Sequence, residues 1–448
     1  MGSEIKVEVL HRETIRPSSP TPDHLKTIRL SVFDQLSPDV YVPLLLFYPN
    51  IDISIHDEVK RNDRCHSLVS ERSKHLKTSL SETLTHFYPF AGKFQYNDSI
   101  WCNDNGAAFL VALVNCPMSN ILDKPDAGMG KQLLPTDVDS TQADMGYLLL
   151  VQANFFQCGG GLAIGVSVSH KVSDASTLSA FIKSWASIAL GSASTYHVVL
   201  PAEFGAAASL FPPLDFLNAP QPAVEFPKEK CKTRRFVFNV SKIAALKSKA
   251  ASVTVPNPTR VQVVSALIWK CGMEASRSNL GCVRPSEWFV LVNMRKILVQ
   301  PSADNVLGNF IGVFATKTEA SKFVDNVESL VTKLREEIEG FKVKYGIGIN
   351  GNDVWEFSKD YWKLLIRNDV ETYSCSSWCR FPFYENDFGW GKPSWVTQGM
   401  EFKNLLVLMD TRDGDGIEVF LTLKEEDMAI FESNKKLLEY ASLNPTVI

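Results

Sequence analysis

A proline-rich segment near the middle of the chain constrains the fold most, because it divides the sequence into two parts. Six prolines lie between Leu200 and Lys228, together with a run of alanines. Proline fixes φ and removes a backbone donor, so such a segment interrupts both helices and sheets. The chain has 448 residues, too many for one ordinary core. We therefore predict an N-terminal domain at 1–199, a linker at 200–228 and a C-terminal domain at 229–448.

Each half mixes helical and strand patterns. In the first half, period-two patterning predicts strands at 94–102, 107–114, 147–157 and 162–169. A helix is predicted to follow them at 173–190. In the second half we predict a helix at 260–271, a strand at 288–294 and a long amphipathic helix at 324–338. A hairpin at 405–423 and a closing helix at 425–441 follow. Neither half alternates strand and helix strictly. The pattern favours an α/β class of two layered domains over a barrel or a doubly wound sheet.

Charge and composition exclude several function classes. The formal net charge is −4, and no dense run of Lys and Arg is interleaved with aromatics, so nucleic acid is not an expected partner. The nine cysteines contain no Cys-x-x-Cys pair and the histidines form no His-x-x-x-His pair, so we expect no metal site. The N-terminus lacks the apolar core of a secretory signal, and polar residues interrupt the most apolar stretch. We expect a cytoplasmic protein that does not span a membrane.

Two motifs match familiar sites only in part. Gly346 to Gly351 fits the dinucleotide pattern G-x-G-x-x-G, but a predicted helix precedes it where a strand is needed, so we interpret it as a loop. Gly165 to Ser169 lacks the second glycine of a hydrolase nucleophile elbow. Ser167 is therefore expected on a strand, and a serine hydrolase is disfavoured.

One histidine has a position suited to catalysis. His170 follows the apolar run 162–169 and precedes a predicted helix whose N-cap is Ser173 or Asp174, so it lies at a strand end. Histidine is the side chain whose ordinary pKa suits a general base near neutral pH. The spacing His-x-x-x-Asp also arises by chance. The pentapeptide alone leaves open a buried, hydrogen-bonded histidine beside an N-capping aspartate.

A second motif favours the catalytic interpretation of His170. Asp-Phe-Gly-Trp-Gly at 387–391 is followed by Lys-Pro, and a given pentapeptide rarely occurs by accident in a chain of this length. With both motifs in this order, the sequence resembles the BAHD acyltransferases of plant specialised metabolism. Further landmarks of that family occur at 80–93, 292–295, 308–309 and 376–380. The opening segment and the form of the second motif look most like the branch containing vinorine synthase and alcohol acetyltransferases.

The resemblance implies a fold and an activity. It implies two chloramphenicol-acetyltransferase-like domains, each a mixed sheet with helices, with the active-site tunnel at their interface. The implied enzyme is an acyl-CoA-dependent O-acyltransferase that acetylates the hydroxyl of an alkaloid, a terpenoid, or an aromatic or aliphatic alcohol. Acyl-CoA, most simply acetyl-CoA, would be a co-substrate, with no cofactor bound permanently. The family also implies a monomer.

The resemblance also implies roles for the two residues of the first motif. His170 would take the proton of the acceptor hydroxyl and return it to the departing CoA thiolate, with no covalent intermediate. Asp174 would be structural, forming an ion pair with Arg295 that fixes the turn.

Three residues near the C-terminus complete the candidate site. Asp387 would support the CoA side of the site, and the family convention counts it among the essential residues. Ser376 and Trp378 would line the tunnel near the reacting carbonyl, with Ser376 donating a hydrogen bond to developing charge. Packing of a core strand is the alternative for both.

Other functions remain open at this point. The chain is alternatively a non-catalytic ligand-binding relative with the same tunnel, or the same fold using a larger aromatic acyl-CoA or an amine acceptor. A hydrolase of acyl esters would require an acyl-enzyme on a serine.

Overall fold

The computed structural model describes most of the chain. The residues outside the description are 1–4, 50–57, 126, 139, 141–144, 158–159, 192–203, 218–228, 299–305, 321–324, 366, 368 and 448. Most of the predicted linker at 200–228 therefore lies outside the described residues. Its described part contains the short helix α6 (Ala206–Leu210) and the 3-10 helix η6 (Asp215–Leu217). The alanine run thus forms helix, while the domain limits stay a prediction.

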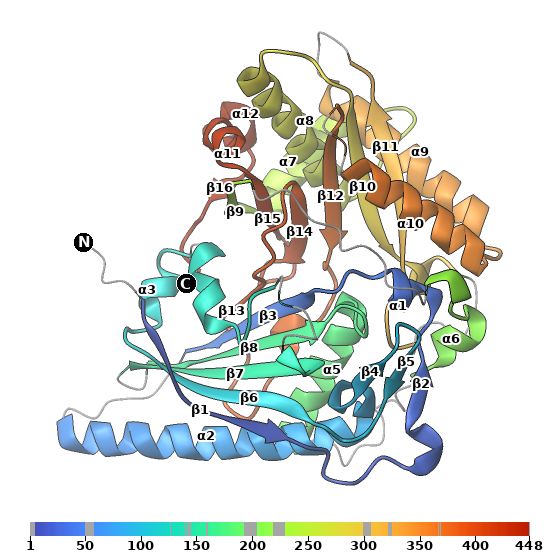
Figure 1. The fold of residues 1–448 in the computed structure, drawn as a ribbon. Helices are drawn as coiled ribbons and strands as arrows, with labels where there is room; N and C mark the ends of the chain where they lie inside the picture. Colours follow the sequence, from blue (N-terminus) through green and yellow to red (C-terminus); the bar gives the residue numbers. More distant parts are fainter. Residues whose placement is uncertain are drawn as a thin grey trace.

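Five strands of the first half of the chain and one strand of the second half build a six-stranded mixed sheet (Figure 1). In spatial order its strands are β1 (Val7–Ile15), β6 (Ala107–Val114), β7 (Leu149–Phe156), β8 (Leu162–Ser169), β3 (Tyr41–Tyr48) and β13 (Trp395–Thr397). Only β6 and β7 run parallel; the other neighbours are antiparallel. A smaller sheet contains β2 (Thr27–Arg29), β5 (Ser99–Trp101) and β4 (Lys93–Gln95).

The second half builds a seven-stranded mixed sheet that lies above the first in Figure 1. Its strands in spatial order are β11 (Ile311–Thr318), β10 (Ser286–Asn293), β12 (Glu371–Ser377), β14 (Leu405–Asp410), β15 (Ile417–Lys424), β9 (Cys231–Phe238) and β16 (Ser442–Leu443). Strands β10, β12 and β14 are parallel to their neighbours in that set, and the remaining pairs are antiparallel. The two mixed sheets confirm the α/β class.

Helices accompany both sheets. The first half contains α1 (Val32–Leu36), α2 (Glu58–His86), α3 (Ser119–Leu122) and α5 (Ala175–Ala189), with 3-10 helices η1 (Asp23–Leu25), η2 (Tyr88–Ala91) and η3 (Ala127–Leu133). The second half contains α7 (Val240–Ala250), α8 (Arg260–Leu280), α9 (Val327–Tyr345), α10 (Gly351–Leu365), α11 (Glu425–Phe431) and α12 (Lys435–Leu438), with η7 (Met294–Lys296) and η9 (Phe383–Glu385). None of the helices in the described residues is long and apolar enough to cross a membrane.

Apolar periodicity explains how α2 and α5 meet the first sheet. Leu76, Leu80 and Leu84 recur every fourth residue on α2, and all three are fully buried in one core with the sheet. Trp185 of α5 is fully buried, and its indole nitrogen donates to the Ser79 hydroxyl at 3.0 Å. All eight residues of β8 are buried too, which is typical of a central strand covered on both faces. The end of β8 is consequently a rigid position.

The C-terminal part of the sequence returns to the first sheet. Strand β13 pairs with β3, with Trp395 opposite Phe47, and the two rings stack with centroids 5.2 Å apart. Trp378, Phe383 and Phe388 belong to the same apolar core as β3 and β8. The segment with the second motif, predicted within a C-terminal domain, therefore packs against the sheet built by the first half.

Several sequence predictions differ from the structure in extent. The single closing helix expected at 425–441 is wrong, because it is interrupted after Phe431. Asn434 caps a second helix there by accepting hydrogen bonds from the amides of Lys436 and Leu437. The helix expected at 260–271 continues to Leu280 and ends at Gly281.

Candidate active site

His170 lies where β8 ends. Its backbone amide donates to the carbonyl of Val40 at 2.8 Å, directly after the last ladder pair between Ser169 and Tyr41. The residue keeps partial exposure, whereas every residue of β8 is buried. The strand therefore fixes the backbone of the histidine, and the residue as a whole is not fully enclosed.

Asp174 begins the helix that follows. Its carboxylate accepts a hydrogen bond from the Thr177 amide at 2.8 Å, which makes Asp174 the N-cap of α5. The other carboxylate oxygen lies 2.6 Å from a guanidinium nitrogen of Arg295 and also accepts from the Phe310 amide at 3.1 Å. The ion pair expected from the family resemblance is present, and both side chains are almost fully buried.

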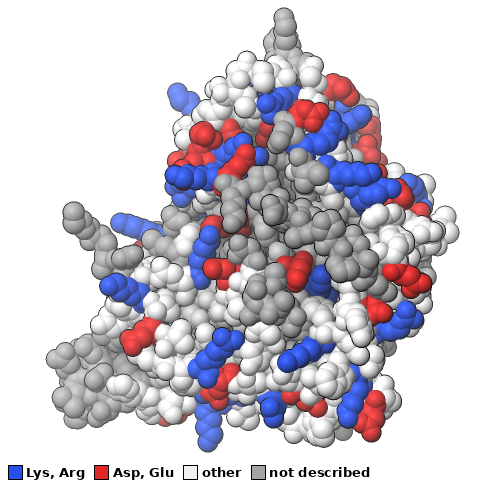
Figure 2. Space-filling model, viewed as in Figure 1, with Lys and Arg blue, Asp and Glu red and all other residues white. Residues whose placement is uncertain are grey.

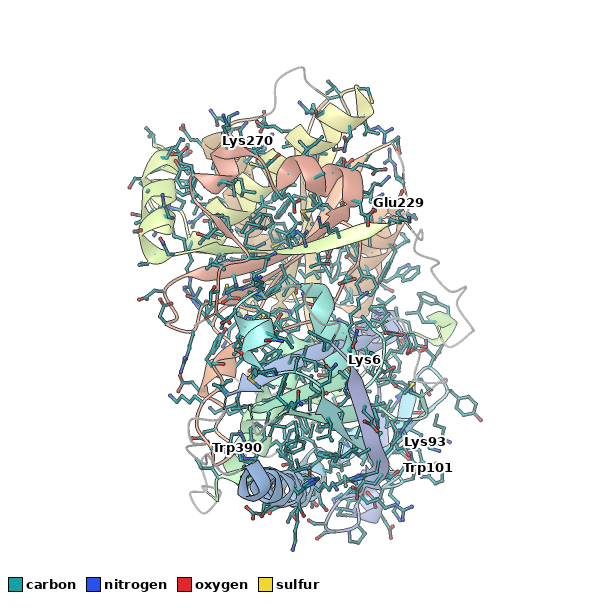
Figure 3. All side chains as sticks on the ribbon, turned by 90° about the vertical axis from the view of Figure 1, so that its left-hand side faces the viewer. Lys6, Lys93, Trp101, Glu229, Lys270 and Trp390 are labelled. Carbon is teal, nitrogen blue, oxygen red and sulfur yellow. The ribbon has the colours of Figure 1, made fainter. Side chains whose placement is uncertain are left out.

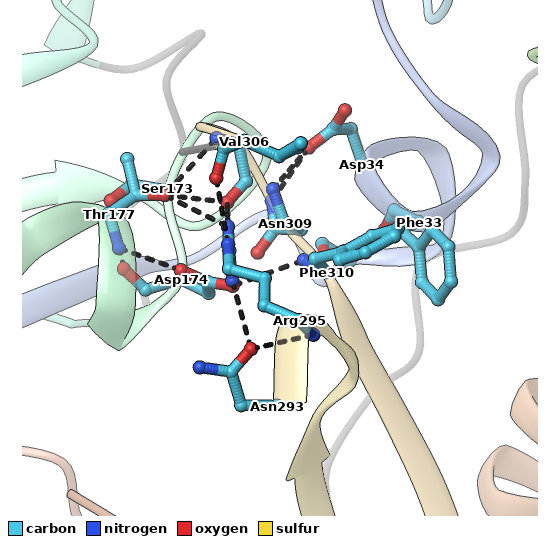
Figure 4. Close-up of polar contacts among 12 residues, drawn as sticks. Phe33, Asp34, Ser173, Asp174, Thr177, Asn293, Arg295, Val306, Asn309 and Phe310 are labelled. Atoms are coloured by element: carbon cyan, nitrogen blue, oxygen red, sulfur yellow. Dashed lines mark hydrogen bonds and ion pairs between the residues drawn. The ribbon is translucent and has the colours of Figure 1, made fainter. Parts of the chain in front are cut away.

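Arg295 joins the two halves of the sequence at this point (Figure 4). Its remaining guanidinium nitrogens donate to the carbonyls of Val306 and Gly308 at 2.7 and 3.0 Å. Asn293 at the end of β10 accepts from the Arg295 amide at 3.0 Å. A buried charge needs such complete hydrogen bonding to offset its desolvation, so this network is a fixed junction.

The His170 imidazole itself contacts Asn309. Nδ1 of the ring lies 3.1 Å from the Asn309 side-chain oxygen, and the Asn309 side-chain nitrogen donates to the His170 carbonyl at 2.5 Å. Asp34 in α1 accepts from the Asn309 backbone amide at 2.7 Å. Sequence reasoning gave Asn309 no role and missed Asp34. The only signal for Asp34 was its capping-box spacing from Ser31, which indicates a helix start and not a site.

The environment of His170 favours its neutral form. Burial lowers the pKa of the imidazole below its ordinary value of 6.5, and a hydrogen bond to the backbone of His170 itself, the charge of Asp174 and the hydrogen bond with Asn309 oppose that effect in part. A neutral imidazole is the form that accepts a proton.

The pH dependence of activity follows from this direction. A base works only when deprotonated, so a lowered pKa moves the loss of activity to lower pH. We expect kcat/KM to be flat around neutral pH and to fall with an inflection below 6.5, the ordinary histidine value. Initial rates between acidic and mildly basic pH measure this directly. An inflection above the ordinary value would contradict the assigned environment.

Asp387 organises its own loop. One of its carboxylate oxygens accepts from the amides of Gly389 and Gly391 at 2.8 and 2.9 Å. Both glycines have positive φ, +105° and +94°, a conformation that residues with a Cβ rarely adopt. Asp387 therefore closes a compact turn through backbone contacts.

Aromatic residues fix this loop against α2. Phe388 is fully buried, and its carbonyl lies 3.0 Å from Nε2 of His75. The Arg72 guanidinium lies 5.0 Å from the centroid of the Trp390 ring, a cation–π distance. Figure 3 shows Trp390 beside α2, which is viewed end-on. The motif links the C-terminal part of the sequence to the first-half helix layer.

Substitution of Asp387 separates a structural role from a catalytic one. Asp387→Ala removes an acceptor for two amides, so we expect the free energy of unfolding to fall by about 1–3 kcal/mol. Asp387→Asn keeps one acceptor oxygen and should lose less. Urea unfolding and steady-state kinetics of both variants test this. If kcat fell as far as in a His170 variant with stability unchanged, a direct chemical role for Asp387 would replace the structural one.

Ser376 and Trp378 lie at the end of β12. The Trp378 indole nitrogen donates to the Ser376 hydroxyl at 3.1 Å, and Trp378 itself is buried against Phe383. Ser376 is partly exposed and lies opposite Leu291 in β10, two residues before Asn293. The Ser376 hydroxyl accepts from Trp378 and also carries a proton that it can donate. Core packing describes Trp378 well.

The remaining motifs take the places expected of them. Gly346 ends α9 and Gly351 begins α10, so the G-x-G-x-x-G segment connects two helices. Ser167 is buried on β8. Within the described ranges, no group of three or more His, Cys, Asp or Glu side chains is placed to hold a metal ion. Acidic and basic side chains are interspersed over the face drawn in Figure 2.

Comparison with known proteins covers nearly the whole chain. The model of the Transferase family matches residues 5–438. Akuammiline synthase 1 of Alstonia scholaris is 40% identical over 433 residues, which is 96% of each chain. Limonoid 21-O-acetyltransferase of Melia azedarach is 35% identical over 452 residues, covering 99% of this chain and 100% of the other.

Solved structures share the same fold. The crystal structure of vinorine synthase superposes with a TM-score of 0.83 at 33% identity, over 99% of this chain and 100% of the other. TRI101 of F. sporotrichioides, complexed with coenzyme A and T-2, superposes with a TM-score of 0.70 over 93% of this chain and 99% of the other. At 18% identity the second likeness concerns the fold alone.

Proposed function

This chain belongs to the Transferase family, the BAHD acyltransferases, and on that premise we propose that it transfers an acetyl group from acetyl-CoA to a hydroxyl group of a plant specialised metabolite. Acyl transfer as such follows from family membership. The acetyl donor and the alcohol acceptor are the finer part of the proposal. They are supported by the relative named as a limonoid O-acetyltransferase.

The observation that carries the mechanism is the position of His170. Asn309 contacts Nδ1 of a ring that is fixed at a strand end, so we assign Nε2 to the substrate. In the proposed reaction Nε2 takes the proton of the acceptor hydroxyl as that oxygen attacks the thioester carbonyl. When the tetrahedral intermediate collapses, the C–S bond breaks and the same proton passes to the CoA thiolate. The acyl group moves directly, without an acyl-enzyme.

The other candidate residues support this reaction indirectly. Asp174 and Arg295 hold the turn after β8 and do not exchange protons with substrate. We assign Ser376, whose hydroxyl accepts from Trp378, the role of donating its proton to the carbonyl oxygen as negative charge develops there. Asp387 maintains the loop that we assign to the CoA side.

The substrates would meet in a tunnel at the interface of the two domains. The junction between Asp174 and Arg295, which are 121 residues apart in the sequence, supports this location, because it brings the end of β8 against the second sheet. The domain limits 1–199 and 229–448, the cytoplasmic location and the monomeric state belong to the same proposal.

A thiol-release assay tests the proposal. The full chain is incubated with acetyl-CoA and a panel of alkaloid, terpenoid and benzylic alcohols, and both free CoA and acetylated product are measured. We expect CoA release that depends on the acceptor and an ester product of matching amount. Parallel reactions with amines test whether the acceptor is an amine, and reactions with aromatic acyl-CoA donors test whether the donor is a larger aromatic acyl-CoA.

Two outcomes would favour other functions. CoA binding without release over the whole panel would support a non-catalytic relative. Release without acceptor, together with a covalent acyl group on a serine detected by mass spectrometry, would support a hydrolase. Ser167→Ala is the matched control for a serine acyl-enzyme. Since Ser167 is buried on β8, this substitution should not change the rate of a direct transfer.

A further inference from the structure

We propose that Asn309 is a positioning residue that holds His170 in the tautomer with its proton on Nδ1, and that Asp34 fixes the Asn309 amide in the orientation this requires. The inference rests on the proposed function, because it explains what keeps Nε2 free to take a proton. It involves three separate parts of the chain: helix α1, the turn after β8, and the segment before β11.

The orientation of the Asn309 amide follows from its neighbours. Its side-chain nitrogen lies 2.5 Å from the His170 carbonyl oxygen and 3.1 Å from a carboxylate oxygen of Asp34. A carbonyl oxygen accepts hydrogen bonds and cannot donate them, and the same holds for the oxygens of an ionised carboxylate. The opposite amide orientation would bring an oxygen against both acceptors. The donating –NH₂ group must therefore face them, which leaves the amide oxygen beside Nδ1 of His170.

This orientation decides which ring nitrogen carries the proton. The amide oxygen cannot donate, so a hydrogen bond across the 3.1 Å to Nδ1 requires the proton on Nδ1. A neutral imidazole has one N–H, and the hydrogen bond made by one nitrogen sets the state of the other. Nε2 then keeps its lone pair, as a general base needs. A histidine locked in the other tautomer would present N–H to the acceptor hydroxyl.

Asp34 is itself held in place by four donors. One carboxylate oxygen accepts from the backbone and side-chain nitrogens of Asn309, at 2.7 and 3.1 Å. The other accepts from the amide and hydroxyl of Ser31, at 2.8 and 2.7 Å. Burial raises the pKa of the Asp34 carboxyl, and these hydrogen bonds oppose that rise. Four donors around two oxygens match an ionised carboxylate.

The backbone before Asn309 is equally constrained. Gly308 has a φ of +105°, and a Cβ at this position would lie 3.2 Å from Asp34. Its carbonyl accepts from the Thr177 hydroxyl at 2.8 Å and from Arg295 at 3.0 Å. The segment that orients the imidazole is thus fastened to the junction that contains Asp174. The base in the first half of the sequence depends on an asparagine from the second half.

Charged groups around His170 determine how its titration responds to a substitution. Asp174 favours the imidazolium and Lys171, the next residue, disfavours it. Asp34 reaches the ring through Asn309, and Arg295 neutralises Asp174. The hydrogen bond with Asn309 raises the pKa of His170, so its removal should lower that pKa.

The direct test is ¹⁵N NMR of the full-length protein labelled at histidine, with the His170 signals identified by their loss in His170→Gln. At a pH where the ring is neutral, we expect a protonated, pyrrole-type Nδ1 and an unprotonated, pyridine-type Nε2. In Asp34→Ala only the His170 carbonyl still holds the Asn309 –NH₂ group, so the two His170 signals should move towards an average of both tautomers. A wild-type Nε2 that carries the proton overturns the proposal without any variant.

Kinetics of Asn309 variants provide a second readout. We expect Asn309→Ala to lower kcat by about 10–100-fold, the usual effect of removing an orienting partner, with the KM for acyl-CoA little changed. The acidic inflection of Asn309→Ala should move to lower pH, because the hydrogen bond that it removes raises the pKa of His170. A merely structural role would lower activity and stability without this shift. Asn239→Ala, which removes the N-cap of the distant helix α7, is the matched control.

The outcomes separate this inference from the proposed function. Turnover that requires His170 in a protein whose Nε2 is protonated would overturn the role of Asn309 and leave acyl transfer standing. The expected tautomer in a protein that releases no CoA with any acceptor would overturn acyl transfer and leave the role of Asn309 as an orienting residue.

Discussion

Replacing His170 with alanine should reduce turnover by about 10²–10⁴-fold, because it removes the base that takes the proton of the acceptor. The ring is held at a strand end by β8 and by its contact with Asn309, and neither the strand pairing nor the Asp174 network depends on the imidazole. We therefore expect CoA binding and the unfolding transition to remain close to those of the unchanged protein. Isothermal titration with CoA and urea unfolding measure these two properties, and a thiol-release assay measures turnover.

The control for this variant is a histidine outside the site. His24 is exposed in η1, so His24→Ala makes the same change of side chain without affecting the candidate base. It should retain full turnover. Undiminished activity in His170→Ala would refute the assignment of the base, and equal losses in the two variants would point to a general effect on the protein.

The second large effect concerns stability. Asp174→Ala leaves the Arg295 guanidinium buried without its counter-ion, so we expect the free energy of unfolding to fall by about 3–5 kcal/mol. Arg295→Ala should cost a similar amount, since it leaves the carboxylate unpaired. Asp174→Asn should be milder because the amide oxygen still accepts from Thr177. Urea unfolding followed by tryptophan fluorescence compares the three variants.

An exposed ion pair provides the contrast. Lys317 and Glu319 lie 3.9 Å apart with both side chains largely in solvent, so Glu319→Ala should leave the unfolding curve unchanged. A double variant that removes both Asp174 and Arg295 should recover part of the loss, because no unpaired charge then remains buried. A wild-type unfolding curve for Asp174→Ala would show that the junction does not hold the turn.

Local sequence signals predicted the turn that carries His170 well. The apolar run before His170 predicts a buried strand, and the polar residues after it predict a helix cap; the structure has β8 and the N-cap Asp174 at these positions. Both features depend on residues adjacent in the sequence. Hydrophobic period and capping chemistry are local properties, so they are readable without a fold.

The partners of the site were not readable in the same way. Asn309 is 139 residues from His170 and Asp34 is 275 residues from Asn309, and no periodicity relates such distant positions. The return of β13 to the first sheet is also non-local, because a three-residue strand carries no information about which sheet it joins. The interruption of the predicted closing helix before Asn434 was missed for a different reason. Apolar residues continue on either side of the interruption, so the pattern resembles one helix, whereas Asn434 is the N-cap of a second one.

The central claim is that Nε2 of His170 takes the proton directly from the acceptor hydroxyl. A crystal structure of the His170→Gln variant or of the wild-type protein with CoA and an unreactive acceptor alcohol tests it most directly. We expect the acceptor oxygen at about 2.6–3.2 Å from the position of Nε2, with the CoA sulfur on its far side. An acceptor bound elsewhere, with the imidazole enclosed by protein and out of contact with both substrates, would contradict it.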